Sequence, residues 1–258
     1  MAKKKSPLKV SPLRVAGQAA DEAIERLIAD EETKYIVFAL TFFSLAGLEW
    51  YRYFTKAPYA PILTSIAAAI VIGFSLVKIR TIRGKIRDYR LGRDGERAVA
   101  EILDDLRPMG CGVLHDVAGE GFNVDHVVVS THGIFAIETK TPRKAKGDRI
   151  RVEAGRLMVG TASWGEHPIH QAIESGKWLG ELLKASTGRE MAVRPVLVFP
   201  DWMVDPVPGD VKRTVWVLNP KALPSWIENE PHRLPEEDVH LATFHLSRYI
   251  RAKTAETA

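Results

Sequence analysis

The sequence contains very little cysteine, since Cys111 is the only one among 258 residues. A single thiol excludes a disulfide framework, and it excludes a zinc site built from four thiolates of one chain. The chain also lacks a Walker loop, a Gly-x-Ser-x-Gly elbow and any internal repeat. These absences argue against ATP-driven chemistry and against a serine triad. Disorder is excluded as well, because 46% of the residues are hydrophobic, which is ample for a core.

Positive charge is concentrated at the start of the chain, although the formal net charge is only +4. Residues 1–90 hold 15 Lys and Arg against 8 Asp and Glu, whereas residues 91–258 hold 21 against 24. A positive balance favours anionic partners. The sequence therefore predicts that an anionic partner would bind the N-terminal third of the chain.

Two apolar runs lie in this basic third. Residues 35–48 contain no charge over fourteen positions, and residues 57–77 contain none over twenty-one. The second run is long enough to cross a hydrocarbon layer of about 30 Å, and the first is long enough if its aromatic end lies at the interface. The pattern predicts two transmembrane helices, at about 34–54 and 58–79. A buried helical hairpin and a cleaved signal peptide are the alternatives, and the late start of the first run argues against the latter.

Basic residues flank both predicted spans, whereas the joining loop carries only Lys56. The positive-inside rule then predicts a multi-pass protein of the cell (inner) membrane with cytoplasmic N- and C-termini. Residues 1–33 form a cytoplasmic segment with a short amphipathic helix over 15–32, and 81–90 form a basic linker. We expect the run Lys78–Arg90 to contact anionic lipids, with nucleic acid as the alternative partner.

Residues 91–258 alternate between helix and strand patterns. Helices are expected at 94–106, 167–185 and 236–253. Strands are expected at 111–117, 124–130, 134–140, 149–153, 156–160, 193–199 and 214–218. The strands centred on Val127 and Ala136 are apolar without alternation, which is typical of strands covered on both faces. The pattern predicts an α/β domain with a mixed sheet flanked by helices.

Four polar residues interrupt these apolar patterns. Glu96 lies on the apolar stripe of its helix, Asp125 opens one buried strand, and Glu138 and Lys140 end the next strand on one face. A two- or four-residue loop between the strands would place Asp125 opposite Glu138. A three-residue loop would place them on opposite faces unless a bulge restored the phase.

Carboxylates gathered at strand ends repel one another unless a cation lies between them. Asp125 and Glu138 therefore suggest a site for Mg²⁺ or Mn²⁺, because oxygen ligands favour hard cations. Lys140 beside the metal would stabilise charge on a phosphate, which is the chemistry of phosphodiester hydrolysis. The alternative is an ion-paired strand end, in which Lys140 neutralises Glu138 and Glu96 is merely solvated.

Three stretches of the sequence resemble one known family: LGRDGERAVAEIL, FNVDHVVVSTHGIFAIETK and HPIHQAIESGKWL. Together they are similar to the nuclease-related domain, NERD, over about residues 91–200. The resemblance implies a restriction-endonuclease-like fold of the PD-(D/E)xK superfamily and a metal-dependent nuclease acting on DNA. It places the family motif on Glu96, Asp125, Glu138, Lys140 and Gln171, with Glu96 as a further metal ligand beside Asp125 and Glu138. Val124 stands where the wider superfamily has proline, which leaves the ligand set intact.

Other polar residues near the motif have two interpretations. Gln171 contacts either a phosphate or a backbone carbonyl, and His126 faces away from Asp125, which favours packing over catalysis. A basic run that includes Arg143, Lys144, Lys146 and Arg149 either binds the DNA backbone or forms a solvated loop.

Three functions are consistent with the whole sequence. The first is a membrane-anchored, cytoplasm-facing nuclease that uses Mg²⁺ or Mn²⁺ on DNA. The second is a catalytically inactive membrane-tethered adaptor that binds nucleic acid or a protein partner. The third is a scaffold whose spans form a homo-oligomer through the small residues Ala67–Ala69 and Gly73. The cluster of three carboxylates and a lysine favours the nuclease.

Overall fold

A computed structural model describes residues 13–58, 60–143 and 149–257. The chain divides into two compact units, which are described separately. The helical unit spans Ala19–Leu91, and the α/β unit combines Gly92–Ala258 with the N-terminal segment up to Gln18. The α/β unit therefore includes residues that precede the helical unit in sequence.

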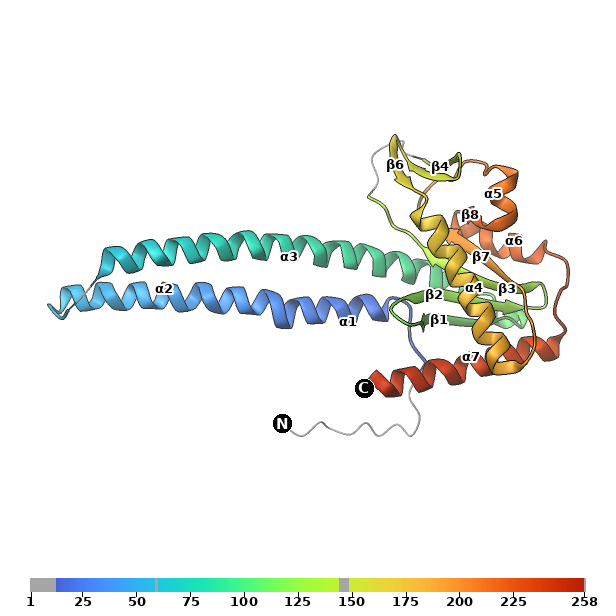
Figure 1. The fold of residues 1–258 in the computed structure, drawn as a ribbon, viewed down its shortest axis with the longest axis horizontal. Coiled ribbons are helices and arrows are strands. Elements are labelled where there is room, and N and C mark those ends of the chain that lie inside the picture. The colour runs from blue at the N-terminus through green and yellow to red at the C-terminus, as the bar shows by residue number, and fades with distance from the viewer. Residues whose placement is uncertain (1–12, 59, 144–148, 258) are drawn as a thin grey trace. The chain divides into compact units, whose positions relative to one another are not determined.

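The helical unit is built from long helices (Figure 1). Helix α1 (Gln18–Arg26) continues through a π-helical turn (Leu27–Glu32) into α2 (Thr33–Phe54), and α3 follows as Pro61–Asp104. Helix α3 is one helix of 44 residues, so the predicted linker at 81–90 is helical and the helix expected at 94–106 is not separate but forms the C-terminal part of α3. No proline interrupts the sequence between Pro61 and Pro108, and its Lys, Arg and Ile residues are compatible with helix. The separate short helix over 15–32 is likewise replaced by a helix that runs into α2.

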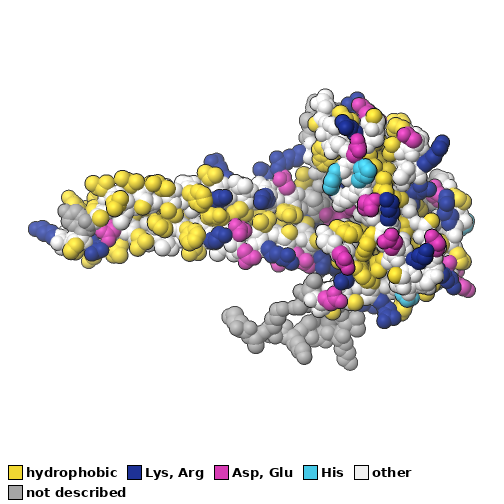
Figure 2. Space-filling view, viewed as in Figure 1, with side chains coloured by type: hydrophobic (Ala, Val, Ile, Leu, Met, Phe, Trp, Pro, Cys, Tyr) yellow, Lys and Arg dark blue, Asp and Glu magenta, His cyan; other side chains and the backbone are white. Residues whose placement is uncertain are grey.

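Large apolar side chains of α2 and α3 are exposed, whereas small or moderate side chains of α3 are buried inside the hairpin. On α3 the residues Ala68, Ser75 and Ile82 are buried at seven-residue spacing, which is typical of a coiled-coil seam. The outer surface of the hairpin is rich in hydrophobic side chains, which Figure 2 shows in yellow. Those with more than half of their surface exposed are Val37, Leu40, Phe43, Leu48, Tyr51, Phe54, Ile62, Leu63, Ile66, Ile70, Phe74, Leu76 and Val77.

One of the described helices, which contains α3, is long and apolar enough to cross a membrane. Helix α2 does not meet the same criterion of length and hydropathy in the described part of the chain. Its sequence explains the difference, because Lys34, Glu49 and Arg52 limit its apolar length. A membrane association is therefore indicated by one helix, and the second predicted span is not established.

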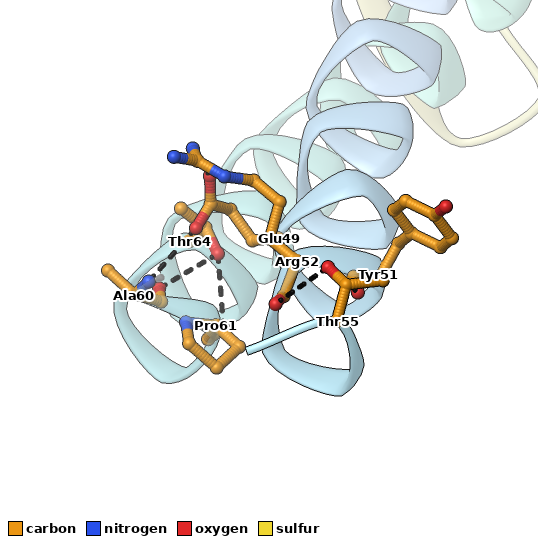
Figure 3. Close-up of polar contacts among 7 residues, drawn as sticks. All are labelled: Glu49, Tyr51, Arg52, Thr55, Ala60, Pro61 and Thr64. Atoms are coloured by element: carbon orange, nitrogen blue, oxygen red, sulfur yellow. Dashed lines mark hydrogen bonds and ion pairs between the residues drawn. The ribbon is translucent and has the colours of Figure 1, made fainter. Parts of the chain in front are cut away.

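The turn between α2 and α3 is fixed by polar contacts (Figure 3). Glu49 accepts the backbone N–H of Ala60 at 2.9 Å and an N–H of Arg52 at 2.8 Å. Thr55 and Thr64 donate their hydroxyl hydrogens to backbone carbonyls at the two helix ends. Glu49 therefore supplies an acceptor at the N-terminus of α3, where backbone N–H groups lack helical partners.

The α/β unit contains a five-stranded mixed sheet in the order β1-β2-β3-β7-β8. The strands are β1 (Gly112–Ala118), β2 (Asn123–Ser130), β3 (Gly133–Thr139), β7 (Val193–Val198) and β8 (Trp216–Leu218). The first three pair in antiparallel fashion, and β3, β7 and β8 pair in parallel. The prediction of a mixed sheet flanked by helices is confirmed. The last strand is shorter than expected, because the chain up to Thr214 forms α5 (Gly209–Thr214).

Both faces of this sheet are covered, as the unbroken apolar strands predict. Apolar residues of α4 (His167–Thr187) and α7 (Glu236–Thr257) pack on one face. The end of α3 and α6 (Leu223–Glu228) pack on the other face. Every residue of β3 is buried. The central strand is therefore a rigid support for the residues at its C-terminal end.

A second sheet lies between β3 and α4 in the sequence. Its strands are β4 (Ile150–Glu153), β5 (Arg156–Val159) and β6 (Ala162–Gly165), all antiparallel. The first two match the predicted hairpin, whereas β6 was not predicted. Apolar residues of β4 and β5 pack against the first turns of α4 and against β7. Short 3-10 helices occur at Arg107–Met109 and Pro220–Ala222.

Candidate acidic site

The register between β2 and β3 brings the predicted carboxylates together. Ser130 pairs with Gly133, so the connecting loop has two residues, and His126 pairs with Ile137. The same register continued by one step places Asp125 opposite Glu138. Of the loop lengths that the sequence left open, the two-residue loop is the one that forms, and no bulge is needed to restore the phase.

Glu138 lies at the centre of the cluster and is only 3% exposed. Its Oε1 accepts hydrogen bonds from Lys140 Nζ and from Gln171 Nε2, each at 2.6 Å. Gln171 comes from the first turns of α4. Three residues of the motif, Glu138, Lys140 and Gln171, therefore meet at one oxygen atom. The other oxygen, Oε2, is buried without a hydrogen-bond partner among the described residues. An unpaired buried carboxylate oxygen is costly, and a bound cation would relieve that cost.

Asp125 and Glu96 flank Glu138. Asp125 Oδ2 accepts the backbone N–H of Thr139 at 2.7 Å, which ties the start of β2 to the end of β3. Glu96 reaches the strand ends from α3. Its neighbour Gly95 permits this approach, because a Cβ at that position would lie 2.0 Å from Thr141 Cγ2.

The pKa values of all three carboxyl groups are raised above their ordinary values. Burial is the main cause for each of them. Charge on Asp116 and Glu138 contributes further to Glu96, whose pKa is raised to about 7. Charge on Glu138 and Glu96 contributes further to Asp125, whose pKa lies well above its ordinary value. Lys140 opposes the shift at all three. The site therefore concentrates more negative charge than its single lysine neutralises.

Sequence reasoning missed a fourth carboxylate, Asp116 on β1. The β1–β2 register pairs His115 with His126 and Val117 with Val124, so its continuation places Asp116 opposite Asp125. Asp116 interrupts the ladder because its φ is +51°, an uncommon conformation for a residue other than glycine. Its side chain is buried and binds Arg14 and Asn123. One feature of the sequence could have indicated it. If the strands on either side of the glycines Gly119 and Gly121 form a hairpin in which Ala118 pairs with Asn123, the same register places Asp116 opposite Asp125.

The donor set suits a hard divalent cation, although the carboxylates are engaged in other contacts. Within the described ranges, no group of three or more His, Cys, Asp and Glu side chains is arranged to hold a metal ion. Magnesium needs fewer protein ligands, because it is often held by one or two carboxylates and keeps several waters. The unpaired Oε2 of Glu138 and the mutual repulsion of the carboxylates both fit such a cation.

His126 does not belong to this cluster. It is buried, and its Nδ1 lies 2.9 Å from Nδ1 of His115, whose Nε2 lies 3.2 Å from Asp104. Burial lowers the pKa of both imidazoles. Its position agrees with the expected packing role. His167 and His170 are exposed at the start of α4.

Two of the four predicted DNA-binding residues, Arg143 and Arg149, belong to the described part of the chain. Arg143 is exposed. Arg149 is paired with Asp205 at 2.6 Å, so its charge is partly neutralised by the chain itself. Lys144 and Lys146 lie outside the described residues.

Residues 91–200 match the family model of the nuclease-related domain, NERD. The match supports membership of this segment in that family and indicates a nuclease-related function, and the mixed sheet flanked by helices fits a nuclease-like fold. No curated protein and no solved structure matched the chain.

Proposed function

We propose that the α/β unit is a nuclease that hydrolyses phosphodiester bonds of DNA with Mg²⁺ or Mn²⁺. The observation that carries this proposal is the buried, unpaired Oε2 of Glu138 beside Asp125 and Lys140. The match to the nuclease-related domain supports a nucleic-acid substrate, and DNA is part of the proposal. When bound, the metal would act as a Lewis acid on the scissile phosphate and lower the pKa of a bound water.

Each side chain of the site has a role that its position supports. Asp125 and Glu138 would hold the metal, and Glu96 would act as a further ligand or orient a water. Gln171 fixes Glu138 through Oε1, which leaves Oε2 open. Lys140 is partly exposed and would donate a hydrogen bond to a phosphate oxygen or to the attacking water.

The DNA strand would run along the small sheet, where Arg143, Lys144, Lys146 and Arg149 follow β3 in sequence. The ion pair of Arg149 with Asp205 weakens its share of phosphate binding. Arg143 and Arg149 are the described candidates for a contact with the DNA backbone.

The helical unit would anchor this nuclease to the cell (inner) membrane as a two-helix hairpin with both termini in the cytoplasm. Large apolar residues are exposed on both α2 and α3, which supports insertion of both helices, and on α3 the small residues Ala68 and Ser75 are buried instead. A hairpin in water would show the opposite distribution. The exposed Ala69 and Gly73 are positions where a homo-oligomer contact would form.

The basic run Lys78–Arg90 would contact anionic lipids, but an ion pair within the chain reduces its net positive charge. Arg83 donates to Glu32 at 2.7 Å, and Ile82 and Ile86 pack against Ile24 of α1. Glu32 of the π-helical turn therefore neutralises part of the charge of this run.

The test uses the full chain in detergent, with its Glu138→Ala and Lys140→Ala variants. Each is incubated with plasmid DNA, single-stranded DNA and RNA, in Mg²⁺, Mn²⁺ or EDTA. We expect cleavage of DNA that needs the metal and falls by about a hundredfold or more in each variant. Glu174→Ala, an exposed α4 change, is the matched control and should cleave as the wild type does.

Absence of both cleavage and Mn²⁺ binding in a folded chain would contradict the nuclease proposal. That result would favour the membrane-tethered adaptor, which keeps Glu138 as an ion-paired strand end. Binding of Mn²⁺ without cleavage of any substrate would contradict the proposed substrate class and leave the metal site in place.

A further inference from the structure

The residues just before α1 pack onto the acidic site. We call Leu13–Gly17 the N-terminal strap. Leu13 contacts the apolar cluster between the sheet, α4 and α7, and Arg14 and Ala16 are buried. Val15 between them is 59% exposed. The strap belongs to the α/β unit although residues 19–91 separate it from the rest of that unit in sequence.

Arg14 provides the strap with a positive charge inside the site. Its Nε donates to Asp116 Oδ2 at 2.7 Å, and the two side chains are only 8% and 4% exposed. Asp116 Oδ1 accepts a second hydrogen bond from Asn123 at 2.7 Å. Because a guanidinium does not lose its proton in proteins, Arg14 is a permanent cation beside this carboxylate.

The strap also contacts Glu96. The backbone N–H of Gly17 donates a hydrogen bond to the Glu96 carboxylate. Gly17 has a φ of +74°, and a Cβ at this position would lie 2.6 Å from Arg93 Cγ, one turn before Glu96 on α3. The absence of a side chain at Gly17 therefore permits the close approach.

These contacts place the strap in competition with a metal. A guanidinium next to Asp116 repels a divalent cation, and the Gly17 N–H uses an acceptor position on Glu96. The charge on Asp116 also acts on Glu96, so the guanidinium lies beside a carboxylate of the same cluster. Docking of the strap thus supplies positive charge to the carboxylates that a metal would otherwise neutralise.

We propose that the N-terminal strap is an intramolecular competitor of the divalent cation, with Arg14 as the resident cation of the acidic site. Release of the strap frees Glu96 and Asp116 and strengthens metal binding. The strap continues directly into α1, so the helical unit is covalently connected to this switch. The inference rests on the proposed function, because it requires metal binding at Asp125 and Glu138.

The experiment measures Mn²⁺ affinity by calorimetry on the full chain in detergent, without DNA. The variants are Arg14→Gln, which removes the charge, and Gly17→Ala, which blocks the close approach to Arg93. The matched control is Val15→Ala in the exposed position of the strap. We expect Arg14→Gln and Gly17→Ala to bind Mn²⁺ about tenfold more tightly and Val15→Ala to match the wild type.

Linkage requires the reverse effect as well, so saturating Mn²⁺ should increase hydrogen exchange at residues 14–17 of the wild type. This readout remains decisive if Arg14→Gln fails to fold because Asp116 is left buried and unpaired. Unchanged or weaker affinity in the folded variants, or unchanged exchange in a wild type that binds Mn²⁺, would overturn the strap alone. Failure of the wild type and every variant to bind Mn²⁺ would overturn the metal site and the strap together.

Discussion

At the scale of single residues, the site depends on how one carboxylate is held. Lys140 and Gln171 both bind Oε1 of Glu138, and Oε2 has no hydrogen-bond partner in the part of the chain that the structure describes. If Lys140 had bound one carboxylate oxygen of Glu138 and Gln171 the other, both oxygens would have a hydrogen-bond partner and the group would be an ordinary ion pair. The asymmetry is what distinguishes a candidate ligand from an ordinary strand end.

Glu96 makes the stability of the metal-free protein depend on pH. Its carboxyl ionises near the ordinary value of 4.5 in the unfolded chain and at about 7 in the folded chain. Between these values the folded state binds more protons, so the free energy of unfolding falls as the pH rises. We expect Glu96→Gln to reduce this fall by about 1–2 kcal/mol, less than the full shift because Glu96 is partly exposed.

The measurement is urea unfolding of the full chain in detergent and EDTA at about pH 5 and about pH 7, followed by tryptophan fluorescence. Glu101→Gln, an exposed change on the same helix, should keep the wild-type dependence. An identical pH slope in Glu96→Gln and the wild type would show that Glu96 is not held at the acidic cluster.

At the scale of elements, the position of α3 decides whether Glu96 reaches the strand ends. The helix packs Val99 and Leu103 on the sheet and brings Gly95 against Thr141, just beyond β3. Two glycines one turn apart on this helix differ in surroundings. Gly95 is in close contact, whereas nothing lies within 4 Å of a Cβ at Gly92.

Substitution of these glycines should have opposite effects. Gly95→Ala should destabilise the α/β unit by about 1–3 kcal/mol, because the added methyl group overlaps Thr141. Gly92→Ala should stabilise it by about 0.5–1 kcal/mol, because alanine favours helix. Urea unfolding of the two variants tests this. Equal stabilities would mean that Thr141 turns away at little cost and that α3 is not closely held there.

At the scale of the whole molecule, the exposed apolar residues of the α2–α3 hairpin lead to a prediction of membrane topology. The turn of the hairpin and the α/β unit should lie on opposite sides of the membrane. Thr55 lies in the turn between α2 and α3 and is exposed, and Cys111 is the only native thiol. In a Cys111→Ser background, we expect Thr55→Cys to react with an impermeant maleimide in intact cells. Glu237→Cys, exposed on α7 of the α/β unit, should react only after permeabilisation.

Labelling of Thr55→Cys only after permeabilisation would contradict the hairpin. It would mean either that α2 does not cross the membrane or that the protein is not inserted. Labelling of both sites in intact cells would contradict the cytoplasmic location of the α/β unit.

The sequence by itself determined the mixed α/β unit, its main strands and the cluster of Glu96, Asp125, Glu138 and Lys140. These predictions rest on local pattern, because apolar runs and side-chain alternation report burial and face directly. The two-residue turn between β2 and β3 then selected one of the registers that the sequence left open.

Only the tertiary structure decided the features that depend on distant segments. Helix α3 continues through residues 81–90, where the basic run had suggested a linker, and Ile82 and Ile86 of this run pack against Ile24 of α1. The contact of Arg14 with Asp116 joins residues 102 positions apart, and no local pattern reports such a pairing. The role of Arg14 and Asp116 depends on the fold, because only the fold buries these two residues against each other as an ion pair.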